Sequence, residues 1–165
     1  MKLEYLKEEM IDDAYSIIED AIAFLAEQKI DQWQDNYPNK NTLIVDINNK
    51  SAFVLVDDEG DLLAYASISL DKEILYEEID TWKCNNTYAI LHRTAVNANY
   101  RNMGIFKSLI NEISLYLKTL NVSCIRIDTH PDNKIMIKSL QSCGFIEVGS
   151  MIYDQGLRLA FELCI

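Results

Sequence analysis

The sequence predicts an α/β domain with a mixed, mostly antiparallel sheet that has a central parallel strand pair and helices on both faces. Segments rich in β-branched and apolar residues alternate with segments whose apolar residues recur every three or four positions. The order strand, loop, helix, strand, helix, strand over residues 88–150 implies a parallel crossover. Short turns towards both ends of the chain join neighbouring strands as antiparallel hairpins. Together these patterns favour one layered α/β core.

The length and composition fit a single domain over residues 1–165. With two prolines, five glycines and 49% apolar residues, the chain does not resemble a disordered one. The longest apolar run, residues 21–26, is far shorter than the roughly 20 residues of a membrane-spanning helix. We therefore expect no membrane partner.

The N-terminal residues and the cysteines indicate in which cellular compartment we expect the protein. The first nine residues carry charges where a secretory signal has its apolar core, so we expect a cytoplasmic protein. The four cysteines show no Cys-x-x-Cys spacing, and free cysteines are usually buried. The sequence thus predicts buried free thiols and no metal site. These cysteines are Cys84, Cys124, Cys143 and Cys164.

Acidic side chains are concentrated in the first half of the chain. Residues 1–83 carry 20 acidic and 7 basic side chains, a balance of −13, whereas residues 84–165 carry 6 and 8, a balance of +2. The asymmetry favours a cationic partner for one half and an anionic partner for the other. A solvated acidic helix and loops would explain it equally well. The total of −11 argues against nucleic acid as a partner, because phosphates repel an acidic surface.

In the N-terminal half, the first long helix has the clearest pattern. Apolar residues recur at three- and four-residue spacing from Met10 to Leu25, which is typical of an amphipathic helix. Two β-branched runs flank residues 57–61 and predict a hairpin. The predicted elements are a strand at 2–6, a helix at 8–28, a loop at 31–41, a short helix at 42–47, and strands at 52–56 and 62–70.

In the C-terminal half, the period of apolar residues changes from two to 3.6 at Gly104. From Ile105 to Leu120 one apolar stripe continues for about four helical turns. Gly144 suits the left-handed position that ends a helix. The predicted elements are an irregular connection at 72–86, a strand at 88–96, a helix from 104, a strand at 122–129, a turn at 130–133, a helix at 134–142, and strands at 145–151 and 157–164 around a loop at 154–156.

The loop that leads into the helix at Gly104 is a candidate anion site. Backbone N–H groups at a helix start have no intrahelical partner, so they can receive phosphate oxygens. Glycine admits close approach of a phosphate, and Arg101 adds positive charge. An arginine and a glycine at a helix start also occur as plain capping, so the motif alone leaves both interpretations open.

This segment resembles the signature of the GNAT superfamily of acyl-CoA-dependent N-acetyltransferases. The signature is Arg or Gln, two residues, Gly, one residue, and Gly or Ala. Residues 101–106 read Arg-Asn-Met-Gly-Ile-Phe and match it except at the last position. The strands at 91–96 and 124–129 and the run from Asn133 to Phe145 fall at the family's spacing. The resemblance therefore rests on four features in order.

The match extends to nearly the whole chain within one branch of the family. Residues 31–38, 91–93 and 126–130 are similar to a bacterial branch of small GNAT proteins whose acceptors are mostly unassigned. The resemblance implies the GNAT-like form of the predicted sheet. It also implies an N-acetyltransferase that moves an acetyl group from acetyl-CoA to an amine.

Acetyl-CoA is accordingly the expected cosubstrate. The resemblance implies that the backbone of residues 102–106 holds the CoA pyrophosphate with Arg101 nearby, and that the pantetheine arm runs beside the strand at 88–96. The helix at 134–142 would contact the other side of the cofactor. The residues implied to bind it are Ala95, Val96, Arg101, Asn102, Met103, Gly104, Ile105, Phe106, Asn133 and Met136.

Two positions depart from the family pattern. Phe106 replaces the small last residue of the signature, although only the backbone N–H is needed there. Leu140 stands four residues before Gly144, where many family members carry a tyrosine that protonates the leaving thiolate. Leucine has no proton to donate, so the usual general acid is absent from that position.

Acetyl transfer to an amine needs a proton acceptor for the amine and a proton for the departing thiolate. His92 is the first candidate base, because its strand runs towards the expected thioester. Tyr153, another hydroxyl or a water could serve as the donor, or the thiolate leaves unassisted. His92 and His130 could equally be histidines with no catalytic role. They are not at metal-ligand spacing, so no metal is expected.

Aromatic side chains in polar loops are candidates for the acceptor pocket, since such residues are usually buried or in contact with something. An acidic run beside Trp82 would favour a cationic amine. In the plainer interpretation, Trp33 pins its loop onto the core and the acidic run is an exposed loop. The candidate acceptor residues are Trp33, Gln34, Tyr37 and Trp82.

Three functions stay open. The first is an N-acetyltransferase for a primary amine of a small molecule, amino acid or peptide, acting by direct attack in a ternary complex. The second is a catalytically weak acetyl-CoA-binding protein with a regulatory or sensing role, which Leu140 would fit. The third is an α/β interaction module in which the glycine loop is only a cap. Family habit also suggests a homodimer.

Overall fold

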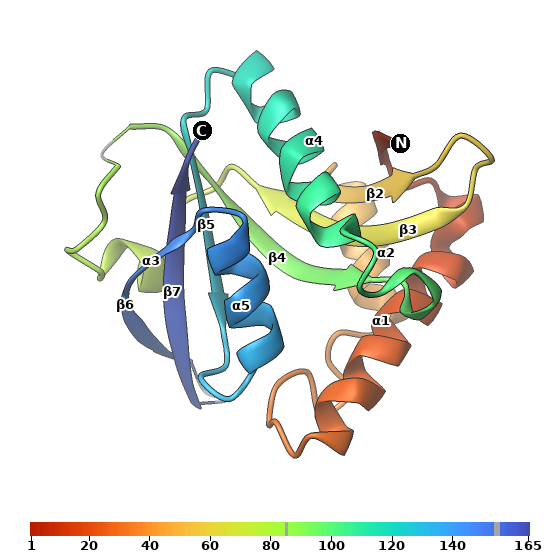
Figure 1. The fold of residues 1–165 in the computed structure, drawn as a ribbon, viewed down its shortest axis with the longest axis horizontal. Helices are drawn as coiled ribbons and strands as arrows, with labels where there is room; N and C mark the ends of the chain where they lie inside the picture. Colours follow the sequence, from red (N-terminus) through yellow and green to blue (C-terminus); the bar gives the residue numbers. More distant parts are fainter. Residues whose placement is uncertain (85, 154–155) are drawn as a thin grey trace.

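A computed structural model describes residues 1–84, 86–153 and 156–165 (Figure 1). The strands are β1 (Lys2–Tyr5), β2 (Ala52–Val56), β3 (Leu62–Ser69), β4 (Tyr88–Val96), β5 (Cys124–Thr129), β6 (Ile146–Tyr153) and β7 (Gly156–Cys164). The helices are α1 (Ile11–Glu27), α2 (Lys40–Asn48), α3 (Ile74–Glu77), α4 (Ile105–Thr119) and α5 (Lys134–Ser142), with short 3-10 turns at Glu8–Met10 and Ala98–Tyr100.

The strands form one sheet in the order β1-β2-β3-β4-β5-β7-β6. The central pair, β4 and β5, is parallel, and every other pair within the described residues is antiparallel. α4 is the crossover between the two parallel strands (Figure 1). The predicted mixed sheet with a central parallel pair is confirmed.

Different helices cover the two faces of the sheet (Figure 1). On one face, Leu109 of α4 and Leu140 of α5 pack in a cluster with Leu91 of β4. On the other face, Ile18 of α1 packs in a cluster with Val54 of β2. The predicted helices on both faces are therefore present, and the sheet is buried between two apolar layers.

The parallel strands separate towards their carboxyl ends. Paired residues run from Tyr88 opposite Cys124 to Leu91 opposite Ile127. Beyond that point residues 92–96 of β4 line a cleft. This separation opens the space between β4 and β5 in which the candidate site lies.

A bulge in β4 lies at the point of separation. The β3–β4 register gains one residue in β4 between the pairs Tyr65–Ala95 and Ser67–His92, and Arg93 has a φ of 50°. A bulge changes the normal alternation of side chains along a strand. Consecutive residues His92 and Arg93 consequently both contact groups that lie over the same face of the sheet, Glu73 before α3 and Asp46 of α2.

The connection predicted as irregular at 72–86 contains one helical turn, α3. Its Tyr76 is fully buried in a small cluster with Ile90 of β4, and Trp82 stacks on the Tyr76 ring at 5.9 Å between ring centroids. The turn is short, so it carries too few residues for a periodic pattern. Part of the loop predicted at 154–156 lies outside the described residues.

The prediction of buried free thiols holds in full for none of the four cysteines. Cys84 and Cys124 form a disulfide with 6.5 Å between the Cα atoms, and Cys164 is exposed. Cys143 is half-buried and free. Spacing in the sequence could not reveal the pair, because it depends on where the 71–87 connection crosses the start of β5.

Among the described residues, no helix is both long enough and apolar enough to cross a bilayer.

Candidate active site

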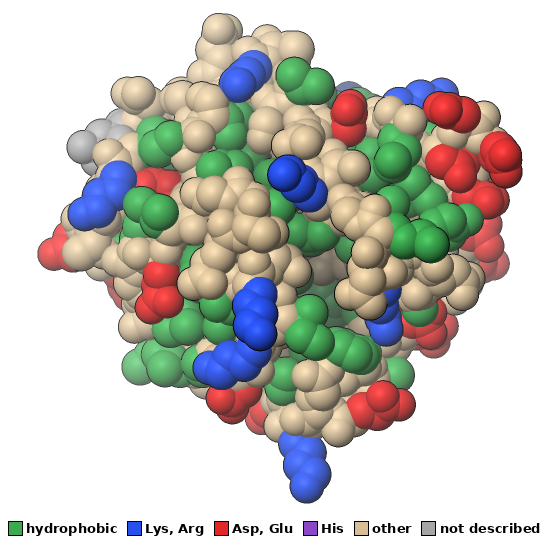
Figure 2. Space-filling model, viewed as in Figure 1, with side chains coloured by type: hydrophobic (Ala, Val, Ile, Leu, Met, Phe, Trp, Pro, Cys, Tyr) green, Lys and Arg blue, Asp and Glu red, His purple; other side chains and the backbone are tan. Residues whose placement is uncertain are grey.

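A cleft of about 770 Å³ runs between the separated ends of β4 and β5. Its walls come from α1, the loop after α1, β4, the start of α4, β5, α5 and the β6–β7 hairpin. Figure 2 shows a hollow on this face, in the region between α4, α5 and α1 of Figure 1. Such a volume is ordinary for a small-molecule or cofactor site.

At one end of the cleft stands the N-terminus of α4. Gly104 caps the helix with a φ of +78°, and a Cβ placed there would meet no atom within 4 Å. The open space means that a ligand can approach the backbone closely at this point. The first N–H groups of the helix have no intrahelical partner, so this end of the cleft favours an anion.

Two basic side chains line the same end of the cleft, Arg101 and Lys107. The guanidinium of Arg101 lies 4.8 Å from the centre of the Phe24 ring and donates a hydrogen bond of 3.5 Å to the carbonyl of Asp20 in α1. These contacts hold Arg101 across the cleft mouth. The predicted anion site therefore combines a helix N-terminus with two cations.

Phe106 lines the cleft and also packs against the main core. Ile105 is buried in that core, and Asn102 and Gly104 line the cleft. Met103 is 68% exposed and is not among the lining residues. The backbone N–H of Phe106 therefore stays in the first turn of α4 despite the large ring. Of residues 101–104, only Met103 does not line the cleft.

The opposite wall is α5. The side-chain oxygen of Asn133 accepts a hydrogen bond from the Met136 N–H at 3.2 Å and so caps the helix, and both residues line the cleft. Leu140 is 0% exposed and belongs to the main core. No donor reaches the cleft from that position.

The edge of β4 carries an unpaired polar group. Thr94 is 4% exposed and lines the cleft, and its hydroxyl is buried without a hydrogen-bond partner among the described residues. A buried hydroxyl of this kind is normally paired. Ala95 and Val96 line the cleft beside it. A ligand with amide groups, such as the pantetheine arm of CoA, would fit this edge because it could pair with Thr94 and the strand backbone.

His92 is held by a carboxylate. Its Nε2 lies 2.7 Å from Oε1 of Glu73, the residue before α3, and its ring stands nearly perpendicular to that of Tyr76, with 6.3 Å between the ring centroids. Burial raises the pKa of Glu73, but His92 and Arg93 together outweigh burial and lower the pKa below its ordinary value. The pair gives the imidazole a fixed orientation at the cleft.

Asp128 of β5 is a second carboxyl group in the cleft. Its Oδ1 accepts a hydrogen bond of 2.6 Å from the hydroxyl of Tyr76. Burial raises the pKa of Asp128 above its ordinary value, against the opposing effect of that hydrogen bond. The neighbouring Tyr153 hydroxyl also has a raised pKa, first because of burial and then because of Asp128 and Glu73. Tyr153 therefore keeps its proton at neutral pH.

A second hollow of about 560 Å³ meets the cleft. The two cavities share Tyr37, His92, Arg93 and Tyr153. The second hollow is lined mainly by polar residues, Asp46, Asn49, Lys50, Ser51, Ser67, Ser69, Asp71 and Glu73 among them. His92 and Tyr153 thus stand at the junction of the cleft and a polar entrance.

A buried ion pair fixes the wall of this entrance. Arg93 donates two hydrogen bonds to Asp46, of 2.9 and 2.7 Å, one to Ser67 and one to the Tyr37 hydroxyl at 2.8 Å. The Tyr65 hydroxyl also donates to Asp46 at 2.6 Å. Burial lowers the pKa of Arg93, but Tyr37 and Asp46 outweigh burial and raise it. The network ties the loop carrying Tyr37 to β4 and α2.

Only two of the four predicted acceptor residues line the cleft. Trp33 and Tyr37 line the cleft, whereas Gln34 and Trp82 do not. The Trp82 indole N–H donates to the carbonyl of Tyr76 at 2.7 Å, so this ring anchors its own segment. Gln32, which sequence reasoning missed, lines the cleft and accepts the His130 N–H at 3.2 Å.

Sequence reasoning also missed Glu73, Tyr76, Thr94 and Asp128 as site residues. Asp128 had a readable signal, since a carboxylate alternates there with apolar residues in a buried strand. Glu73 and Tyr76 had none, because they reach the site through the position of α3. His130 lies in the turn between β5 and α5, where its Nδ1 accepts the Asp132 N–H at 3.1 Å.

The acetyltransferase (GNAT) family model matches residues 13–145. No curated protein sequence matches the chain. A solved GNAT-family acetyltransferase from Streptococcus agalactiae has 30% identity and a TM-score of 0.89, over 99% of this chain and 95% of that one.

More distant structures share the fold. An N-acetyltransferase from Staphylococcus aureus is 18% identical, with a TM-score of 0.70 over 98% of this chain and 96% of that one. A ribosomal-protein-alanine N-acetyltransferase from Brucella melitensis is 17% identical, with a TM-score of 0.72 over the whole of both chains. The family model covers most of the sequence and the fold agrees, so the chain belongs to the GNAT acetyltransferase family.

Proposed function

We propose that this protein transfers the acetyl group of acetyl-CoA to a primary amine of a small molecule, amino acid or peptide. The observation that carries the proposal is the junction of two cavities at His92 and Tyr153. One cavity leads to the helix N-terminus at Gly104 and the other opens through polar residues. Two substrates could therefore occupy the site together and react directly.

The cleft would hold the cofactor through this chain's own groups. The N–H groups at the start of α4, with Arg101 and Lys107, would bind the pyrophosphate. The free edge of β4 at Ala95 and Val96, with the Thr94 hydroxyl, would pair with the amides of the pantetheine arm. Asn133 and Met136 would contact the cofactor from α5.

His92 would accept the amine proton. An aliphatic amine has a reference pKa near 10.4, so deprotonating it at pH 7 costs about 4.6 kcal/mol, and a base placed at the junction reduces that cost. Glu73 holds the imidazole and would stabilise its charged form. A backbone N–H of β4 near Ala95 would stabilise the oxyanion.

Tyr153 would supply the proton for the departing thiolate. Its raised pKa keeps the hydroxyl protonated, and it lines both cavities. Tyr153 would thus take the role of the tyrosine that many family members carry at the position of Leu140. The acceptor entrance is polar and carries carboxylates at Asp71 and Glu73, which favours a hydrophilic, cationic amine.

Thermal unfolding with and without acetyl-CoA tests the cofactor site. A ligand at 100 times its dissociation constant stabilises by about 2.7 kcal/mol, or roughly 5 to 11 °C in midpoint for a chain of this size. Gly104→Glu should abolish the shift. Gly60→Glu is the matched control, because Gly60 also has a positive φ and open space but lies in the β2–β3 turn.

A thiol-release assay over a panel of amines then tests transfer. Turnover that disappears in Gly104→Glu and persists in Gly60→Glu supports the enzyme. Without any shift in midpoint at millimolar acetyl-CoA, the cofactor site itself is refuted.

A weak acetyl-CoA-binding protein with a regulatory or sensing role is the second candidate, favoured by the burial of Leu140 where a proton donor usually stands. It predicts the full thermal shift with no thiol release for any amine in the panel.

A further inference from the structure

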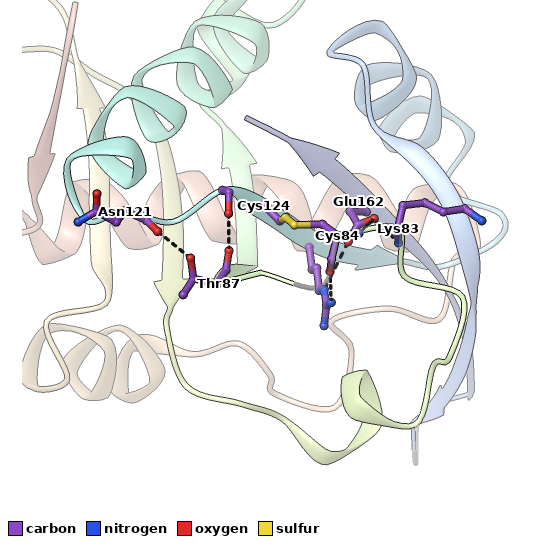
Figure 3. Close-up of a disulfide and its surroundings, with 8 residues drawn as sticks. Lys83, Cys84, Thr87, Asn121, Cys124 and Glu162 are labelled. Carbon is purple, nitrogen blue, oxygen red and sulfur yellow. Dashed lines mark hydrogen bonds and ion pairs between the residues drawn. A yellow bond between two sulfur atoms is a disulfide. The ribbon is translucent and has the colours of Figure 1, made fainter.

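Three cysteine sulfur atoms converge at the end of the sheet remote from the acetyl-transfer cleft. The Sγ atoms of Cys84, Cys124 and Cys164 all lie within 4.8 Å of one another, although the residues come from three separate segments. Cys84 and Cys124 are joined as a disulfide, and Cys164 is a free, exposed thiol (Figure 3 shows the disulfide). A free thiol therefore stands directly beside a disulfide.

Cys164 is also the cross-strand neighbour of Cys124. The two residues are register partners in the antiparallel pair β5–β7. Ile165 donates a backbone hydrogen bond to Ser123 at 2.9 Å, so the next pair along, Cys124 and Cys164, is a non-hydrogen-bonded pair. Such pairs have Cα atoms about 4.5 Å apart, which lies within the range that a disulfide spans. A Cys124–Cys164 disulfide needs no rearrangement of the sheet.

We propose that these three cysteines form a thiol–disulfide exchange site. The Cys164 thiolate attacks Sγ of Cys124, the Cys124–Cys164 bond forms, and the Cys84–Cys124 bond breaks. The electron pair of the broken bond stays on Cys84, which leaves as a thiolate and takes a proton from solvent. One disulfide is exchanged for another, so no outside oxidant or reductant is consumed.

The backbone of Cys84 is held independently of the disulfide. Its backbone N–H donates to Glu162 at 3.2 Å, and its carbonyl accepts from the Arg126 guanidinium at 3.2 Å. Lys83 also donates its N–H to Glu162, at 2.8 Å. These bonds hold the Cys84 backbone in place when the covalent link is lost, so the exchange can reverse.

The exchange would change how the connection between β3 and β4 is attached. That connection carries Glu73 and Tyr76, which contact His92 and Asp128, and the disulfide at Cys84 joins its far end to β5. After exchange the connection is held by hydrogen bonds and packing alone. The exchange site itself is independent of acetyl transfer.

Peptide mapping tests the proposal on the full-length protein. The protein is purified without reductant, kept at mildly alkaline pH for hours, quenched at acidic pH with N-ethylmaleimide and digested with trypsin. Trypsin cleaves after Lys83, Arg93, Lys118, Arg126, Lys138 and Arg158 and places each cysteine in its own peptide. We expect two disulfide-linked pairs, 84–124 and 124–164, with alkylation divided between Cys164 and Cys84.

Cys164→Ser should abolish alkylation of Cys84, and Cys84→Ser should yield only the 124–164 pair. Cys143→Ser is the matched control, because Cys143 is free but not in the cluster, and it should match the unchanged protein. The proposal is overturned if only the 84–124 pair forms. It is also overturned if all three thiols are alkylated without reductant, or if a bound metal ion protects them until a chelator is added.

Discussion

Glu73 and His92 lie 19 residues apart in the sequence, yet Oε1 of Glu73 is 2.7 Å from Nε2 of His92. The contact exists because the segment at the start of α3 crosses the β4 strand just where β4 and β5 separate. Without this crossing, the His92 imidazole would have no carboxylate from Glu73 to fix its orientation. Glu73 is therefore a positioning residue for the proposed base.

The first prediction concerns this pair. His92→Gln should lower kcat by about 10²- to 10⁴-fold, the usual contribution of a general base, with little change in the KM for acetyl-CoA. Glu73→Gln should lower kcat less. If Glu73 acts through His92, the double variant should be no slower than His92→Gln alone. Additive losses in steady-state kinetics would contradict that relationship.

The second prediction concerns the proton donor. Tyr153→Phe should lower kcat at least about tenfold, because a general acid contributes 10²- to 10⁴-fold and water can replace part of it. Tyr88→Phe is the control, since the Tyr88 hydroxyl donates to Glu77 and does not line the cleft. Equal activity of the two variants would exclude Tyr153 as the donor.

The third prediction concerns the buried pair Asp46–Arg93. Asp46→Ala should lower the free energy of unfolding by up to about 3 to 5 kcal/mol, because it removes the carboxylate partner of the Arg93 guanidinium, whose side chain is only 14% exposed. Asp12→Ala breaks the exposed pair with Lys40 and should cost about 0 to 1 kcal/mol. Urea denaturation measures both values, and similar losses would show that Arg93 finds another partner.

The fourth prediction concerns pH. Because burial raises the pKa of Asp128 in the folded state, the folded protein holds a proton that the unfolded chain has released between pH 3.8 and the raised value. Stability should therefore fall as pH rises through that window. Asp128→Asn should remove this part of the slope in urea denaturation from about pH 4 to 7 while keeping an acceptor for Tyr76. The raised pKa would be contradicted if the two proteins differed by the same free energy of unfolding at every pH in that range.

The sheet and the helix start at Gly104 could be predicted because their signals are local. Apolar alternation marks the strands, and the change of period at Gly104 marks α4. The bulge at Arg93 left no such mark, because a positive φ at an arginine follows from the β3–β4 register rather than from its own preference.

Most of the residues predicted to bind the cofactor line one cleft, whereas several residues that line or support its other end were not anticipated. The residues from Arg101 to Phe106 form one contiguous loop and helix start, so their spacing defines their geometry. Glu73, Tyr76 and Asp128 meet through tertiary packing between segments more than 50 residues apart, and the Cys84–Cys124 disulfide depends on the same packing. Trp82 was assigned to the acceptor pocket from its polar neighbours, whereas its ring stacks on Tyr76.

The separation of β4 from β5 leaves part of a central strand with an open edge inside the protein. An open edge usually invites pairing with another chain and promotes aggregation. Here α1 and α5 wall the edge through residues such as Leu25 and Met136. The cleft of about 770 Å³ has the size of a small-molecule or cofactor site. These walls limit access to the edge from other chains, and its pairing capacity is available to the proposed small ligand.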